Sequence, residues 1–183
     1  MHTVVFDEFK ILSIKNFYIP KFYESYKIHK ILDRDFREDR KENHTRGYNF
    51  PVITKDKFFD NLYYEFLVAS KNIFGDDLLV SKSNKNTCWC YRSNKKDFVE
   101  SWHDHAKTAT INSVYYFDIG GGGSISFVKN YKKFTYSPDK NELLIFPGNL
   151  MHKPDRPRTR KNRYTINLEL QTVQSSLYLF GLV

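Results

Sequence analysis

Three histidines in the second half of the chain are spaced as the ligands of a metal ion would be. His103 and His105 are one residue apart, so on an extended segment both imidazoles project to the same side. His152 follows the turn-forming residues Phe146-Pro147-Gly148 and can approach the pair from a distant strand. This pattern predicts a three-point metal site with open coordination positions. Arg163, further along the chain, offers an anchor for an acidic co-substrate.

The other three histidines, His2, His29 and His44, have no such partners at strand spacing. A lone histidine is more often a surface or core residue than a ligand, so we give these three no functional role. The glycine run Gly120–Gly123 precedes a predicted strand, whereas a phosphate-binding loop is followed by Lys-Ser/Thr and a helix. We therefore interpret the run as a flexible β-turn.

The residues before and after position 80 differ in pattern, and this difference predicts how the site is positioned. Phe9–Ile14 alternates as a strand, Phe22–Leu32 reads as a helix, and apolar residues at helical spacing predict another helix from Thr54 to Gly75. After Leu78, β-branched and aromatic residues dominate. They form five strand candidates: Thr87–Tyr91, Ala109–Phe117, Ser124–Phe127, Glu142–Phe146 and Tyr164–Leu170.

The length of 183 residues suits one domain with a sizeable core, and no repeat or linker interrupts it. We predict a single domain over residues 1–183, mainly β with flanking helices (α+β). Residues 1–80 would form a supporting layer of helices and strands, and residues 81–175 a β sandwich or barrel that carries the site.

The charge balance suggests anionic partners, since 29 Lys and Arg residues oppose 21 Asp and Glu residues and give a net charge of +8. Six of the basic residues crowd one short stretch: Lys153, Arg156, Arg158, Arg160, Lys161 and Arg163. Apart from Arg163, we interpret them as a solvated loop held extended by Pro154 and Pro157, with contact to nucleic acid or phosphate as the alternative.

The chain has no apolar stretch long enough to cross a membrane and no secretory signal at its start, so we expect a cytoplasmic protein without a membrane partner. Cys88 and Cys90, the only cysteines, would point to the same face of a strand. So close a pair is poorly suited to a structural disulfide, and we expect both thiols to be reduced and buried.

Between residues 87 and 171 the order of motifs resembles the 2-oxoglutarate- and Fe(II)-dependent oxygenases, particularly the branch similar to prolyl hydroxylases and its phage and bacterial relatives. The family pattern is His-x-Asp/Glu, a Tyr-Tyr/Leu strand, a Gly-Gly-x-x-x-Phe strand, a Phe-Pro turn before a distal histidine, and Arg-x-Ser/Thr. This sequence contains His103-Asp104-His105, Ser113-Val114-Tyr115-Tyr116, Gly122-Gly123-Ser124-Ile125-Ser126-Phe127, Ile145-Phe146-Pro147-Gly148-Asn149-Leu150-Met151-His152 and Arg163-Tyr164-Thr165.

One position departs from that pattern, because His105 stands where the family carries a carboxylate. A related branch with His-x-His before its Ser-Gly-Val-Tyr-Tyr strand looks similar, so we favour His103, His105 and His152 as the metal ligands. Asp104 would point to the opposite strand face, although a local bulge could bring it to the metal.

The resemblance implies a double-stranded β-helix, or jelly-roll, barrel with a hydroxylase activity. Iron(II) would be the cofactor, 2-oxoglutarate and O2 the co-substrates, and ascorbate a candidate reductant. Arg163 and Thr165 would bind the distal carboxylate of 2-oxoglutarate, with Tyr91 and Tyr115 as further candidate hydrogen-bond donors to the same molecule. The three histidines and Arg163 would form the catalytic set.

The substrate remains open at this level. Peptidyl proline or another protein side chain is the leading expectation, nucleic-acid oxidation gains some support from the basic stretch, and a small amino acid or sugar is a further alternative. Two other classes compete: a cupin-like metal or ligand binder, whose motif also begins with His-x-His, and a basic nucleic-acid-binding domain. The chain could act as a monomer or a homodimer.

Overall fold

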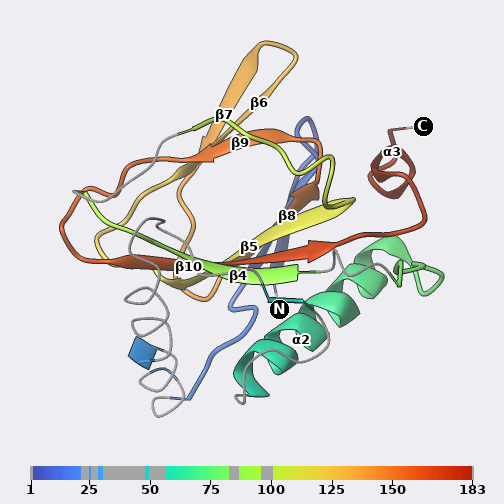
Figure 1. Ribbon diagram of the computed structural model, residues 1–183. Coiled ribbons are helices and arrows are strands. Elements are labelled where there is room, and N and C mark those ends of the chain that lie inside the picture. Colours follow the sequence, from blue (N-terminus) through green and yellow to red (C-terminus); the bar gives the residue numbers. More distant parts are fainter. Residues whose placement is uncertain are drawn as a thin grey trace.

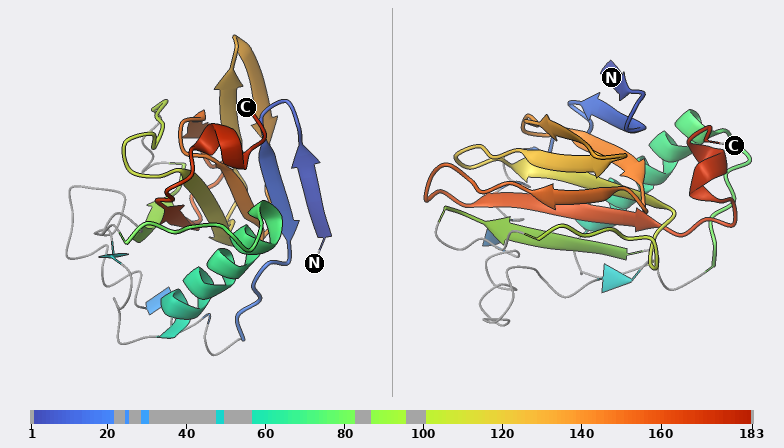
Figure 2. Two further views of the ribbon diagram at one scale, coloured as in Figure 1. Left: turned by 90° about the vertical axis from the view of Figure 1, so that its right-hand side faces the viewer. Right: turned by 90° about the horizontal axis from the view of Figure 1, so that it is seen from above.

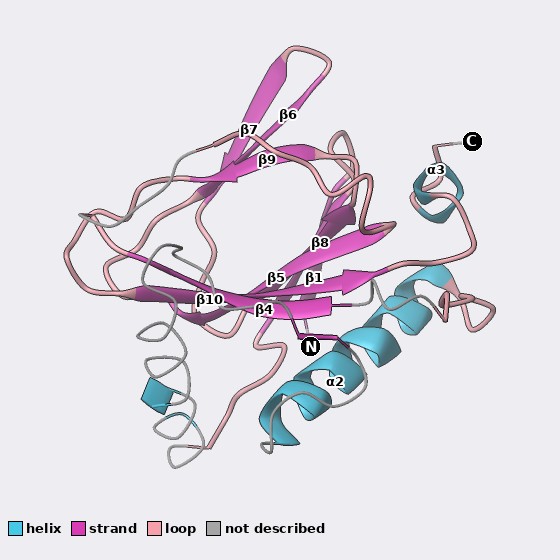
Figure 3. Cartoon of the chain, viewed as in Figure 1, coloured by secondary structure: helices cyan, strands magenta, loops and turns pink. Residues whose placement is uncertain are grey.

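Two β-sheets face each other in the computed structural model, and a long helix covers the outer face of the larger sheet (Figures 1 and 2). The structure describes residues 2–21, 25, 29–30, 48–49, 57–82, 87–95 and 101–182. The strands are β1 (His2–Phe6), β2 (Ile11–Lys15), β3 (Tyr48–Asn49), β4 (Thr87–Ser93), β5 (Ile111–Asp118), β6 (Ile125–Lys129), β7 (Lys132–Tyr136), β8 (Leu143–Pro147), β9 (Met151–Pro154) and β10 (Arg163–Leu170). The helices are α2 (Lys57–Phe74) and α3 (Ser176–Leu179), shown in cyan in Figure 3.

The larger sheet has the antiparallel order β1-β2-β8-β5-β10-β4-β3, and the smaller sheet has the order β7-β6-β9. Alternation along the central strands divides the core in two. In β8, Leu143 and Ile145 pack toward α2, whereas Leu144 and Phe146 pack between the sheets. This arrangement is a double-stranded β-helix, so the predicted fold class is confirmed.

Helix α2 is amphipathic, and its buried side chains recur at intervals of three and four residues: Phe58, Phe59, Leu62, Tyr63, Phe66, Ala69 and Ser70. All of them except Ser70 belong to one hydrophobic cluster with residues of β5, β8 and β10. The helix ends at Phe74. The next residue, Gly75, has a positive φ of 104° that suits the position after a helix, and its N–H donates to the carbonyl of Lys71. The predicted helix is therefore confirmed as a support for the sheet.

The five predicted strands correspond to β4, β5, β6, β8 and β10, and the early strand corresponds to β2. Two strands of the small sheet, β7 and β9, were not predicted. Most of the helix expected over residues 22–32 lies outside the described residues. Cys88 and Cys90 form no disulfide with any described residue, and both are buried in the cluster under α2, as predicted. None of the described helices is long and apolar enough to cross a membrane.

Candidate metal centre

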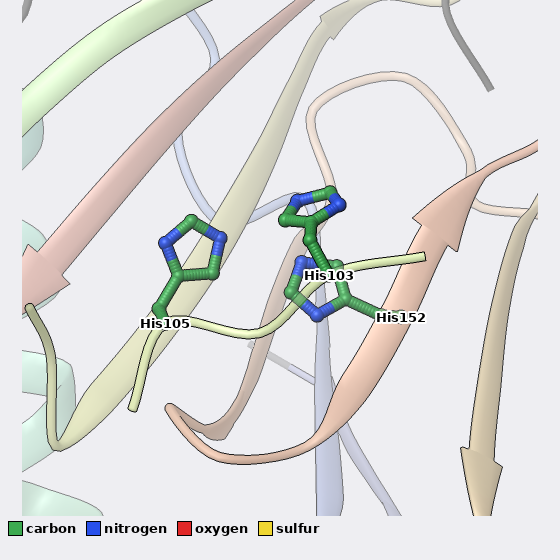
Figure 4. A group of neighbouring side chains, drawn as sticks. All are labelled: His103, His105 and His152. Atoms are coloured by element: carbon green, nitrogen blue, oxygen red, sulfur yellow. The ribbon is translucent and has the colours of Figure 1, made fainter. Parts of the chain in front are cut away.

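The rings of the three predicted histidines lie close together (Figure 4). His103 and His152 form an isolated antiparallel bridge, in which each backbone N–H donates to the other's carbonyl at 3.0 and 2.9 Å. One ligand nitrogen from each of the three rings lies within 4.8 Å of the others. The extended segment of His103 therefore joins the small sheet beside β9, and the two separate stretches of chain meet at a single point.

His105 is held by the turn that follows β8. Its backbone N–H donates to the carbonyl of Gly148 at 2.7 Å, and its own carbonyl accepts from the N–H groups of Thr108 and Ala109. A side chain at Gly148 would overlap the carbonyl of Ala109, so only glycine permits this close approach. The Phe146-Pro147-Gly148 turn thus positions both histidine segments. It leads into β9, which carries His152, and its Gly148 carbonyl binds the backbone of His105.

Hydrogen bonds at Nδ1 set the tautomer of each ring. Nδ1 of His103 lies 3.1 Å from the carbonyl of Ser101, and Nδ1 of His152 lies 2.8 Å from the carbonyl of Leu150. Nδ1 of His105 lies 2.6 Å from a carboxylate oxygen of Glu169. Because all three acceptors require a proton on Nδ1, Nε2 carries the lone pair in each neutral ring. This is the tautomer in which Nε2 can bind a metal.

Burial keeps two of these rings uncharged. Burial is the main cause that lowers the pKa of His152, to about 3, and the nearby His103 and His105 add to the effect. Burial also lowers the pKa of His103. Metal binding requires neutral imidazole, so neither ring must lose a proton before it binds an ion near neutral pH.

Asp104 does not join the three rings. Its side chain is exposed, and one of its carboxylate oxygens accepts from the N–H of Ala106 at 3.1 Å. Among the described residues, the metal-ligand cluster consists of the three histidines and contains no carboxylate. The geometry therefore favours the His-x-His set over a triad that includes Asp104.

Arg163, the predicted anchor for a carboxylate, is buried in the same sandwich with 1% of its surface exposed. Its Nε donates to Ser93 Oγ at 3.2 Å and its Nη1 reaches the carbonyl of Ser124 at 3.5 Å. Its Nη2 has no hydrogen-bond partner among the described residues. Burial lowers the pKa of this guanidinium, yet arginine remains charged, so an unpaired donor here suits a bound anion.

The glycine run makes room for this arginine. Gly123 has a φ of +124°, and a side chain there would overlap Nη1 of Arg163. A side chain at Gly121 would overlap Thr159, and one at Gly120 would overlap the carbonyl of Asn162. The run is a turn, with Gly122 N–H donating to Ile119 O at 2.7 Å, as predicted. The run also packs against the Arg163 side chain at Gly123. The sequence alone did not indicate this contact.

The register of β10 determines which of the predicted side chains face inward. Thr165 pairs with Tyr91 on β4 and with Tyr116 on β5, so these three side chains share the inner face with Arg163. Tyr115 points the other way, into the cluster under α2, and its hydroxyl donates to the carbonyl of Tyr18 at 2.8 Å. Tyr115 therefore packs in the core under α2 and does not lie on the inner face with Arg163.

Tyr116, the next residue, is the tyrosine of this pair that lies on the inner face, opposite Thr165. It is 2% exposed and lies in the cluster between the sheets, where burial raises its pKa and the nearby Arg163 charge lowers it to a smaller extent. The sequence alone did not show which tyrosine of the Tyr115-Tyr116 motif faces inward, because that depends on the strand pairing. Thr165, whose hydroxyl lies 3.5 Å from the carbonyl of Tyr91, stays a predicted partner of the co-substrate.

The basic stretch divides between surface and interior. Arg156, Arg158, Arg160 and Lys161 are exposed on the connection between β9 and β10. Lys153 is partly buried, with its Nζ 5.3 Å from the centroid of the Trp102 ring. Pro157 is buried, so the loop packs against the sandwich rather than extending into solvent.

Comparison with known proteins gives a fold but no close relative by sequence. No family model matches the chain, and no curated protein sequence matches it. Several solved structures share its fold. A prolyl 4-hydroxylase from Phytophthora capsici superposes with a TM-score of 0.66 at 15% identity, over 91% of this chain and 60% of that one. This chain therefore spans less than two thirds of that enzyme's length.

Two other structures are covered more fully. HygX from Streptomyces hygroscopicus, solved with nickel and 2-oxoglutarate bound, has a TM-score of 0.64 at 13% identity, over 92% of this chain and 84% of that one. An oxidoreductase of the 2OG-Fe(II) oxygenase family from Burkholderia pseudomallei has a TM-score of 0.61 at 11% identity, over 88% and 84%. The chain has the double-stranded β-helix fold of these oxygenases.

Proposed function

We propose that the protein is an iron(II)- and 2-oxoglutarate-dependent dioxygenase that hydroxylates its substrate. The observation that carries the proposal is the pairing of two features on one inner surface. Three imidazoles converge in the tautomer that binds metal through Nε2, and a buried arginine has an unpaired Nη2. The donor set suits a first-row transition metal, and the arginine suits a dicarboxylate.

His103, His105 and His152 would hold the metal, and Arg163 the distal carboxylate of 2-oxoglutarate. When bound there, iron(II) would supply the redox chemistry that couples oxidative decarboxylation of 2-oxoglutarate to hydroxylation of a substrate. In the balanced reaction, 2-oxoglutarate, O2 and a substrate C–H bond become succinate, carbon dioxide and a C–OH group. One oxygen atom of O2 enters succinate and the other enters the new hydroxyl.

The protein's own side chains would bind and orient the reactants. Arg163 offers a fixed fork to a carboxylate, because Ser93 and the Ser124 carbonyl already hold Nε and Nη1. The buried aromatic residues between the sheets, Phe127 and Phe146 among them, exclude water around His152, with ring centroids 6.2 and 4.8 Å from the imidazole. A dry site strengthens the contact between guanidinium and carboxylate.

For the substrate, we propose peptidyl proline or another protein side chain. Support comes from the prolyl 4-hydroxylase among the structures that share the fold. Peptides with and without proline, incubated with iron(II), 2-oxoglutarate and O2, would be analysed by mass spectrometry for a gain of one oxygen atom. Turnover of proline-free peptides alone would move the proposal to another side chain.

The cofactor assignment is tested without any substrate. Iron(II) and 2-oxoglutarate added anaerobically should produce the weak charge-transfer absorption of a bidentate keto acid chelate, and His152→Ala should abolish it. Under air, slow formation of succinate should follow. A protein that binds iron at the three histidines yet shows neither the band nor succinate would instead be a cupin-like metal binder.

A second candidate function rests on the exposed residues Arg158, Arg160 and Lys161 between β9 and β10. A cluster of cations on one loop can bind the phosphates of a nucleic acid, with an affinity that falls steeply as salt rises. Binding of a single-stranded oligonucleotide that is lost in the Arg158→Ala, Arg160→Ala double variant but kept in His152→Ala would support it. Binding unaffected by the double variant would refute it.

A further inference from the structure

Glu169 is a buried carboxylate beside the histidines that the roles proposed above do not use. Its side chain is 3% exposed, and its Oε1 lies 2.6 Å from Nδ1 of His105. The hydroxyl of Thr108 donates to the same oxygen at 3.1 Å. A buried carboxylate costs free energy unless it is paired and hydrogen-bonded, so its place against His105 calls for an explanation.

The partner of His105 differs in kind from the partners of the other two rings. Nδ1 of His103 and Nδ1 of His152 each contact a backbone carbonyl, which is neutral. Nδ1 of His105 contacts a carboxylate. A charged acceptor holds the proton on Nδ1 more firmly and makes Nε2 a stronger donor to a metal.

The charged Nδ1 partner belongs to His105, the histidine that stands where related sites carry a carboxylate ligand. Two imidazoles and a carboxylate would bring one negative charge to a divalent ion, whereas three neutral imidazoles bring none. The carboxylate of Glu169 places a negative charge next to the site, on the far side of the His105 ring. The strand register fixes the position of the Glu169 side chain. Glu169 lies on the inner face of β10, opposite Asn112 of β5, while its neighbours Leu168 and Leu170 are buried toward α2.

We propose that Glu169 is a positioning residue for His105, and that it supplies from behind the ring the negative charge that a three-histidine metal site lacks. This inference rests on the metal centre of the proposed function. It predicts that Glu169 governs metal affinity without being a ligand itself, in keeping with its absence from the cluster of ligand atoms.

The test compares two buried glutamates, with Co(II) alone as the probe. Glu169→Gln keeps the size and an acceptor oxygen but removes the charge. Glu142→Gln is the matched control: Glu142 is also buried, and it accepts from Lys15 Nζ and Tyr136 OH, both at 2.7 Å. Affinity would be measured by competition with a chelator, and the environment of the ion by the d–d absorption of Co(II). Urea unfolding of the metal-free proteins would show that each variant is folded.

We expect Glu169→Gln to bind Co(II) about 10- to 100-fold more weakly than the wild type and to shift its absorption bands, as for other residues that support metal-bound histidines. Glu142→Gln should lose stability toward urea but keep the affinity and the spectrum of the wild type. Wild-type affinity and spectrum in Glu169→Gln would overturn the role of Glu169, as would an equal loss of affinity in both variants.

The measurements separate this inference from the proposed function. Co(II) binding requires neither 2-oxoglutarate nor turnover, so a protein that binds Co(II) but never forms succinate would refute the oxygenase and still decide the role of Glu169. If the wild type binds no Co(II), or if His152→Ala binds it equally well, the metal centre and the role of Glu169 are both refuted.

Discussion

Replacing Arg163 by methionine should weaken ligand binding but leave the stability of the ligand-free protein about the same. Methionine has a similar length and no charge. In the ligand-free protein, the substitution removes a buried donor without a partner, Nη2, which costs about 1–3 kcal/mol to bury. It also removes the hydrogen bonds from Nε to Ser93 and from Nη1 to the Ser124 carbonyl, together worth about 2 kcal/mol. Because these losses and the gain are of similar size, we expect the ligand-free variant to be about as stable as the wild type.

The effect on 2-oxoglutarate should be large and unfavourable. A hydrogen bond to a charged group contributes about 1.5–3 kcal/mol, so loss of the two that a carboxylate would accept costs at least about 3 kcal/mol. At about 1.4 kcal/mol for each factor of ten, the dissociation constant should rise more than about 100-fold. Metal affinity in the absence of 2-oxoglutarate should not change, because no histidine contacts Arg163 among the hydrogen bonds of the described residues.

Two measurements and one control decide whether Arg163 binds 2-oxoglutarate or stabilises the fold. Titration calorimetry with 2-oxoglutarate would be run anaerobically on metal-loaded protein, and urea unfolding on the ligand-free chain. Arg158→Met is the control, because Arg158 is exposed on the preceding loop. A dissociation constant close to the wild-type value, together with a ligand-free protein destabilised by several kcal/mol, would show that Arg163 serves the fold and would refute the reasoning.

Three further outcomes are expected. His105→Ala should abolish Co(II) binding while Asp104→Ala preserves it, as measured by equilibrium dialysis; the reverse would restore a carboxylate to the ligand set. Gly123→Ala should weaken 2-oxoglutarate binding in calorimetry without changing metal affinity, because the added methyl group would displace Nη1 of Arg163. Unchanged 2-oxoglutarate binding would show that Gly123 does not position Arg163. The hydrogen bond from His29 lowers the pKa of Asp118 below 3.8, so its stabilisation is present above that pH and is lost as the pH falls through the lowered value. Asp118→Asn should therefore be less stable than the wild type near pH 6, by less than about 1 kcal/mol. Urea unfolding should show that this difference in unfolding free energy shrinks in acid, and a difference independent of pH would contradict the prediction.

The sequence predicted strands that carry a strong apolar pattern and missed two strands of the small sheet that lack one. In β10, apolar residues alternate with polar ones, and both faces are buried. In β7, by contrast, Lys132 and Lys133 are adjacent and exposed at the edge of the small sheet, so no alternation marks the strand. β9 contains only four residues and ends in Pro154, which a pattern search treats as a loop.

The sequence predicted the three histidines whose rings converge in the structure, but not the residues that surround them. His103, His105 and His152 could be found from spacing and order alone. Choosing Tyr116 over Tyr115 required the pairing of β5 with β10, and that pairing shifts by one residue between Tyr164 and Thr165. A bulge reverses which side chains face inward, and no local pattern reveals where it lies. That the whole chain forms one domain stays a prediction.

Strand β10 links the two halves of the site, and its apolar residues determine which side chains face inward. Arg163 and Glu169 lie near its two ends on the inner face, and both are buried. The side chains of β10 that face α2 are Tyr164, Ile166, Leu168 and Leu170. Burial of each contributes roughly 1.5–3 kcal/mol, so the four together can offset the cost of burying two charged groups. A slip of one residue would move all four into the site and turn both charged groups toward α2, which makes this register strongly preferred. The hydrophobic face under α2 is therefore part of what holds the anion-binding and metal-supporting residues in place.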